Sequence, residues 1–76
     1  MAYVGYRIDA DRERATPFAA GINYNEVFMR TFARIAPEVS AFGAPEMQVL
    51  HRDLSEKEAS ELEAICAKIL DVKESQ

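Results

Sequence analysis

The sequence predicts a small α+β fold, a two-layer sandwich in which two or three strands are packed by two helices in the order strand, helix, strand, helix. Three observations support this prediction. Apolar and polar residues alternate over residues 4–9 and 47–52, the period of a half-buried strand. Capping residues followed by apolar residues at spacings of three and four predict helices over residues 23–36 and 55–70. Because 76 residues bury only a marginal core, we expect residues 1–76 to form a single small α/β domain.

The first predicted element is a strand whose inward face carries Val4, Tyr6 and Ile8. Tyr3 then lies on the outward face of this strand. Residues 10–22 lack a clear period and are predicted as a loop. The alternative is that residues 12–16 return as a short edge strand, which Pro17 ends because proline has no N–H for the ladder.

The second predicted element is a helix that begins at Asn23 and ends before Pro37. Glu26, three residues after Asn23, completes an N-terminal capping signal. The apolar arc of this helix is wide and comprises Tyr24, Phe28, Met29, Phe32, Ile35 and Ala36. Since a small domain needs a narrower buried stripe, we expect part of this arc to face another chain.

The second strand and the last helix complete the predicted order. If the strands at residues 4–9 and 47–52 are neighbours, they are expected to run parallel, because the intervening helix returns the chain in the same direction. Ser55 and Glu58 have the spacing of a capping box for the last helix. Its apolar stripe comprises Ala59, Leu62, Ile65, Cys66, Ile69 and Leu70. This stripe should face the core, with Cys66 buried and unreactive.

Composition excludes several classes of function. With one cysteine and one histidine, no internal disulfide can form and the paired spacings of structural zinc sites are lacking, so no metal or cofactor is predicted. The N-terminus reaches Arg7 and Asp9 before any apolar run, so we expect a cytoplasmic protein with no membrane partner. The net charge of −4 argues against a nucleic-acid partner, and a DNA-binding regulator is the weakest of the classes considered.

His51 opens the string His-Arg-Asp, with which the catalytic loop of protein kinases also begins. That loop has Asn five residues after its Asp, whereas here the residue five after Asp53 is Glu58, and no glycine-rich phosphate loop precedes the string. His51 with Asp53 also lacks a nucleophilic partner at a suitable spacing. The string is therefore interpreted as a strand end, a turn and a helix cap. The alternative left open is a small oligomeric enzyme whose site is shared between subunits around His51, with Tyr6 and an arginine.

Aromatic and arginine residues are concentrated in the N-terminal half. All seven aromatic residues lie in residues 1–42, and residues 1–34 contain five Arg and no Lys. Aromatic and Arg residues are enriched at protein interfaces, whereas Lys and Glu are depleted. Local pairing with the interleaved acids Asp9, Asp11, Glu13 and Glu26 is the alternative use of these arginines.

These counts predict a protein-binding module that is not an enzyme: a small regulator, an inhibitor or an accessory subunit. We expect it to bind a protein partner or to self-associate, most simply as a dimer. The residues predicted to contact the partner are Tyr3, Phe18, Tyr24, Arg30, Arg34 and Phe42. Phe18 and Phe42 are expected in exposed loops, and the alternative is that these loops fold over the sheet.

Overall fold

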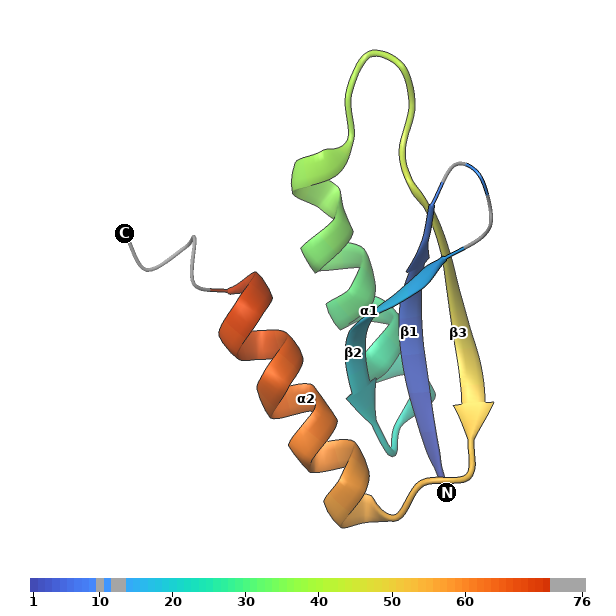
Figure 1. The fold of residues 1–76 in the computed structure, drawn as a ribbon, viewed down its shortest axis with the longest axis vertical. Coiled ribbons are helices and arrows are strands. Elements are labelled where there is room, and N and C mark those ends of the chain that lie inside the picture. The colour runs from blue at the N-terminus through green and yellow to red at the C-terminus, as the bar shows by residue number, and fades with distance from the viewer. Residues whose placement is uncertain (10, 12–13, 72–76) are drawn as a thin grey trace.

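The computed structural model describes residues 1–9, 11 and 14–71. Its elements, in chain order, are β1 (Ala2–Ile8), β2 (Ala15–Gly21), α1 (Tyr24–Ile35), a short 3-10 turn η1 (Ala36–Glu38), β3 (Glu46–Arg52) and α2 (Glu56–Leu70). The strands form one antiparallel sheet in the order β2-β1-β3, and both helices pack against it (Figure 1). The predicted small α+β sandwich is therefore confirmed.

Residues 15–21 form β2, so the loop predicted over residues 10–22 is wrong for that part of the chain, and residues 10, 12 and 13 lie outside the described residues. β2 pairs antiparallel with β1 and continues beyond Pro17, where the alternative short strand was expected to end. Arg12 and Glu13, which that alternative included, lie outside the described residues. An edge strand tolerates proline at a bulge, and the register of the pair shifts at this point.

The direction of β3 also differs from the sequence-based expectation. β1 and β3 are neighbours, but they run antiparallel, with Ala2 opposite Arg52 and Ile8 opposite Glu46. The reason is the missed strand: β2 reverses the chain before α1 begins, so the helix delivers β3 in the direction opposite to β1. The expectation of parallel strands depended on a direct connection from β1 to α1.

Helix α1 begins where predicted, with Asn23 accepting a hydrogen bond from the backbone N–H of the third helical residue. Its buried side agrees with the predicted arc only at Ile35, because the other two buried residues are Val27 and Thr31. The cause is a close approach to β1: a Cβ added to Gly5 would lie 1.8 Å from Thr31 Oγ1. Position 5 of β1 therefore has no room for a side chain opposite Thr31. The Thr31 hydroxyl is satisfied by donating to the carbonyl of Val27, at 2.7 Å.

Helix α2 lies alongside β2 (Figure 1). The predicted capping box is present, because the Ser55 hydroxyl accepts from the N–H of Glu58 and the Glu58 carboxylate accepts from the N–H of Ser55. Ala59 and Cys66 are buried, as predicted for the apolar stripe. Two other members of the stripe are 56% and 66% exposed, Ile65 and Ile69. The stripe therefore only partly faces the core.

Candidate protein-binding surface

The six residues predicted to bind a partner do not form one surface. The structure divides them among the α1–β3 side of the sheet (Tyr3, Tyr24), the α1–α2 side (Phe18, Arg30, Arg34) and the connector before β3 (Phe42). Each place has a different exposure and a different set of contacts. The three places are therefore considered separately.

On the α1–β3 side, four rings follow one another from strand to helix. The ring of Tyr3 lies edge-on to the rings of Tyr24 and His51, with centroids 5.4 Å apart in both pairs. Tyr24 in turn stacks on Phe28 at 6.2 Å. Tyr3 was expected on the outward face of its strand, and this is wrong: α1 covers the face of the sheet that carries Tyr3. A continuous row of rings results.

Helix α1 exposes three of its aromatic side chains. Tyr24, Phe28 and Phe32 are 45%, 39% and 57% exposed, and their spacing of four residues places them along one side of the helix. With Tyr3 beneath them, these residues form the aromatic strip (Tyr3, Tyr24, Phe28 and Phe32). The contact of Tyr3 with His51 places the strip towards β3, whereas the other flank of α1 contacts α2. Such a row of apolar rings in water is typical of a binding surface.

On the α1–α2 side, helix side chains satisfy the outer edge of β2. The N–H of Ala20 donates to Glu63 Oε1 at 3.1 Å, and the carbonyl of Phe18 accepts from Arg34 Nη1 at 2.8 Å. Because β2 is an edge strand, these backbone groups have no strand to bond with. Glu63 and Arg34 therefore close this edge of the sheet.

Arg34 is held within the fold. Its side chain is 8% exposed and bonds Glu63 at 2.8 Å and Asp71 at 3.0 Å. The hydrogen bond to Glu63, followed by that to Asp71, raises the pKa of Arg34 above its ordinary value. The predicted pairing with interleaved acids is correct for Arg30, which binds Glu26, but both acids bound to Arg34 come from the region of α2.

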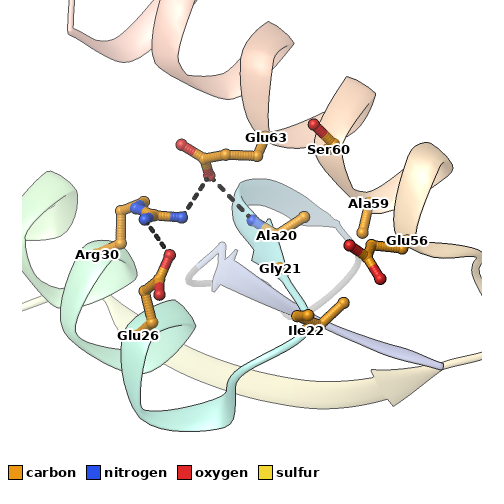
Figure 2. Close-up of a pocket in the computed structure, with 9 residues that line it drawn as sticks. All are labelled: Ala20, Gly21, Ile22, Glu26, Arg30, Glu56, Ala59, Ser60 and Glu63. Carbon is orange, nitrogen blue, oxygen red and sulfur yellow. Dashed lines mark hydrogen bonds and ion pairs between the residues drawn. The ribbon is translucent and has the colours of Figure 1, made fainter.

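Figure 2 shows a hollow of about 270 Å³ beside this network, between the end of β2, α1 and α2. Arg30 points into it and lies between the carboxylates of Glu26 and Glu63, with Glu56 across the hollow. The guanidinium is thus already neutralised, and the hollow offers no positive charge to an anionic ligand. Among the described residues, no three His, Cys, Asp or Glu side chains are grouped so that they could hold a metal ion.

A second, apolar cavity of about 210 Å³ lies between β2 and α2 and includes Cys66. The Cys66 thiol is buried and donates to the carbonyl of Pro17, with sulfur and oxygen 3.6 Å apart. Burial, and then the negative charge of Glu63, raises the pKa of the Cys66 thiol. The predicted burial of Cys66 is confirmed, and a thiol kept protonated in this way is a poor nucleophile.

The two phenylalanines expected in loops have opposite surroundings. Phe18 is 3% exposed within β2, and the guanidinium of Arg7 lies 5.5 Å from its ring centre, so the expected exposed loop position is wrong. Phe42 is fully exposed on a turn between Ser40 and Gly43, where Gly43 has a φ of 121°. Phe42 is therefore a single exposed ring, outside the aromatic strip.

The groups named for the enzyme alternative are not brought together within one chain. His51 is exposed and its ring contacts Tyr3, on the face of the sheet that carries α1. Arg52 Nε donates to the hydroxyl of Tyr6 at 2.9 Å, and these two residues lie on the opposite face because side chains alternate along a strand. The enzyme alternative therefore remains a prediction that no observed contact favours.

Sequence reasoning missed the role of four residues. Phe28 and Phe32 were placed in the wide apolar arc of this helix, part of which was expected to face another chain, but neither was named among the contact residues. Glu63 and Asp71 gave no local signal, because their partner Arg34 is 29 and 37 residues away in the chain. Among the helices described, none is both long enough and apolar enough to cross a membrane. Comparisons with protein-family models, with curated proteins and with solved structures gave no match to the chain.

Proposed function

We propose that the protein is a non-enzymatic protein-binding module, and that the aromatic strip is its contact surface. The observation that carries this proposal is the exposure of Tyr24, Phe28 and Phe32, three neighbouring rings on α1 that are each at least 39% exposed. Large apolar side chains contribute most of the binding energy at interfaces, and burying one fully is worth about 1.5–3 kcal/mol. A small regulator, an inhibitor and an accessory subunit all use such a surface.

The charges around the strip support the same proposal. Arg30 and Arg34 are paired with Glu26, Glu63 and Asp71 on the flank of α1 that faces α2, so their charges are neutralised and lie outside the strip. Nine of the thirteen acidic residues lie in residues 35–76, whereas all members of the strip lie in residues 1–34. An apolar centre with satisfied polar groups around it is the usual composition of a protein interface.

A cytoplasmic setting is part of this proposal. It is supported by the single thiol of Cys66, which is free and buried. Proteins of oxidising compartments that are this small commonly depend on disulfides, and this chain can form none internally.

The proposal is tested by comparing Phe32→Ala with Ile69→Ala. Both residues are large, apolar and more than half exposed, at 57% and 66%, but Ile69 lies on α2, away from the strip. We expect Phe32→Ala to weaken self-association or partner binding by about 1–2 kcal/mol, measured by sedimentation or by affinity capture with the purified chain, while circular dichroism stays unchanged. Binding that is lost in Ile69→Ala and kept in Phe32→Ala would place the contact surface on α2 instead.

A further inference from the structure

The outer edge of β3 is open in the described chain. β3 pairs with β1 alone, and no side chain of α1 or α2 hydrogen-bonds to its backbone. It is seven residues long and has no proline, lysine or bulge, and its two charged residues, Glu46 and Arg52, lie at its ends. Proteins normally blunt an exposed edge strand with one of these devices, because such an edge otherwise pairs with another chain.

The pairing of β1 with β2 shows which β3 residues direct their backbone N–H and carbonyl groups outward, away from β1. The N–H of Ala20 points away from β1, towards Glu63, so Val4, which lies opposite Ala20, directs its own N–H and carbonyl towards β3. Val4 lies opposite Leu50 in that pair, so Leu50 faces β1. By the alternation of an antiparallel ladder, the outward-facing backbone groups are those of Met47, Val49 and His51.

We propose that a second copy of this chain adds its own β3, antiparallel, to this edge, which joins two three-stranded sheets into one continuous sheet. This inference rests on the proposed function, because it names the partner of the aromatic strip. It also gives the open edge of β3 a role in the dimer, which the aromatic strip alone does not explain.

The sequence of β3 is complementary to itself in one register. When the two-fold axis passes through Val49, all residues of the strand overlap, and Glu46 lies opposite Arg52 of the second copy at both ends. Met47, Val49 and His51 then form about six backbone hydrogen bonds across the joint. Moving the axis by one residue, to Gln48 or Leu50, shortens the overlap and places Leu50 or Gln48 opposite a charged residue.

The charged pairs fit the contacts already present. Arg52 uses Nε for the Tyr6 hydroxyl, which leaves the two terminal nitrogens of its guanidinium for a carboxylate. Glu46 already takes part in an interaction within its own chain, and a carboxylate accepts several hydrogen bonds at once. Opposite charges directly across an antiparallel pair stabilise it, and like charges destabilise it.

The same joint covers the aromatic strip. A two-fold axis perpendicular to the sheet keeps both α1 helices on one face, and each helix lies close to its own β1 at Gly5. The two β1 strands are separated by three strand spacings, about 14 Å, whereas helices in direct contact lie about 8–10 Å apart. Large side chains are needed to fill this wider gap, and Phe28 and Phe32 lie on the β3 side of α1, where the gap would be.

The first test measures mass in solution for the full chain and for Val49→Pro. Because the N–H of Val49 points outward, proline removes donors from the joint and takes no hydrogen bond from the β1–β3 ladder. We expect the unmodified chain to sediment at twice the chain mass and Val49→Pro at the chain mass, with unchanged circular dichroism. A monomeric unmodified chain, or a Val49→Pro variant that stays dimeric, overturns the proposal.

The second test reverses charges and stays informative if Val49→Pro does not fold. Arg52→Glu and Glu46→Arg each place like charges opposite one another at both ends of the joint, and each should raise the dimer Kd by about tenfold or more. The double variant Glu46→Arg with Arg52→Glu restores opposite charges and should recover most of the affinity. Single variants without effect, or a double variant as weak as the singles, overturn this register.

The outcomes separate this inference from the function on which it rests. The chain could be monomeric and still bind another purified protein. If Phe32→Ala abolishes that binding, the β3 joint is overturned and the proposed function stands. If the dimer is lost in Val49→Pro but survives both Phe28→Ala and Phe32→Ala, the joint is supported and the aromatic strip is not the contact surface.

Discussion

The two edges of the sheet are equally long, yet side chains of the described helices bond the backbone of only one of them. β2 and β3 both have seven residues and both flank β1. Along β2, Glu63 and Arg34 bond the backbone of Ala20 and Phe18. Along β3, no described helix residue does so, and the nearest helix surface is a row of exposed rings. Glu63 of α2 and Arg34 of α1 therefore close one edge, and the aromatic residues of α1 lie on the side of the other.

Side-chain size explains why the helices cover the two edges differently. β2 has the sequence Ala-Thr-Pro-Phe-Ala-Ala-Gly, and its small residues allow α2 to approach closely enough for its side chains to reach the strand backbone. β3 contains larger residues throughout, Glu-Met-Gln-Val-Leu-His-Arg, which are suited to cross-strand packing. The difference indicates that an edge strand can be protected by remote side chains without any device in the strand itself.

The largest effect on stability is expected on the covered side, at Arg34. We expect Arg34→Met to lower the free energy of unfolding by about 2–3 kcal/mol, because Asp71 and the Phe18 carbonyl lose this donor and Glu63 loses its bidentate partner. Denaturant unfolding measures this loss. Arg14→Met, at an exposed position, is the control and should stay within about 0.5 kcal/mol. If Phe32→Ala on the open side destabilised the chain as much as Arg34→Met, the contrast between the two sides would be wrong.

A smaller effect is expected at Glu63, where two substitutions separate hydrogen bonding from charge. Glu63→Ala should cost about 1–2 kcal/mol, because the N–H of Ala20 loses its acceptor. Glu63→Gln keeps an acceptor oxygen and should cost less, since it removes only the charge. Glu61→Ala is the control: Glu61 lies two residues before Glu63, on the exposed face of α2, and its removal should have little effect. Equal losses for the two Glu63 variants would mean that the charge, not the bond to β2, is what matters.

Next in size is the start of the helix that covers β2. Ser55→Ala should lower the free energy of unfolding by about 1 kcal/mol, because the N–H of Glu58 loses its acceptor. Ser60→Ala, in the exposed interior of α2, is the matched control and should be neutral or slightly stabilising, because Ala is the better helix former. An unchanged midpoint for Ser55→Ala would show that the cap does not contribute to holding α2 in place.

The smallest effect is a pH dependence at the same cap. The hydrogen bond from the backbone N–H of Ser55 lowers the pKa of Glu58 from its ordinary value of 4.5, and a hydrogen bond with the Ser55 side chain adds to this effect. A lowered pKa in the folded state means that the stabilisation is fully present above pH 4.5 and is lost as the pH falls through the lower, folded value. The stability difference between the unmodified chain and Glu58→Gln should therefore shrink on acidification. A difference that is constant with pH would contradict this.

The sequence predicted what depends on neighbouring residues. The Asn23 cap and the Ser55–Glu58 capping box involve partners three residues apart, so both helices were located with nearly correct ends. β2 was missed because its Ala-rich sequence has no alternation of apolar and polar residues, and the direction of β3 was missed with it. A strand without an alternating pattern can be identified only from its pairing with the rest of the sheet.

The candidate surface was predicted only in part, for a related reason. Tyr24 was expected at an interface and is exposed, but Phe18 was taken for a loop residue because the strand that buries it was not recognised. The buried side of α1 is set by the close approach of Thr31 to Gly5, a contact between residues 26 positions apart, which no local period reports. Hydrophobicity alone indicated an arc too wide for the core, and the steric limit at Gly5 selected Val27 and Thr31, with only Ile35 of the arc buried.

The bonds that close β2 also fix an order of events during synthesis. Ala20 and Glu63 are 43 residues apart, and the Cys66 thiol is 49 residues from the Pro17 carbonyl that it contacts. A ribosome releases the chain from the N-terminus, so the strands and α1 emerge before α2 exists. Until α2 forms, the N–H of Ala20 lacks its acceptor Glu63, so the outer edge of β2 is only partly covered, by Arg34 of α1. A chaperone that recognises exposed strands would therefore meet this protein mainly in the interval before its last helix has folded.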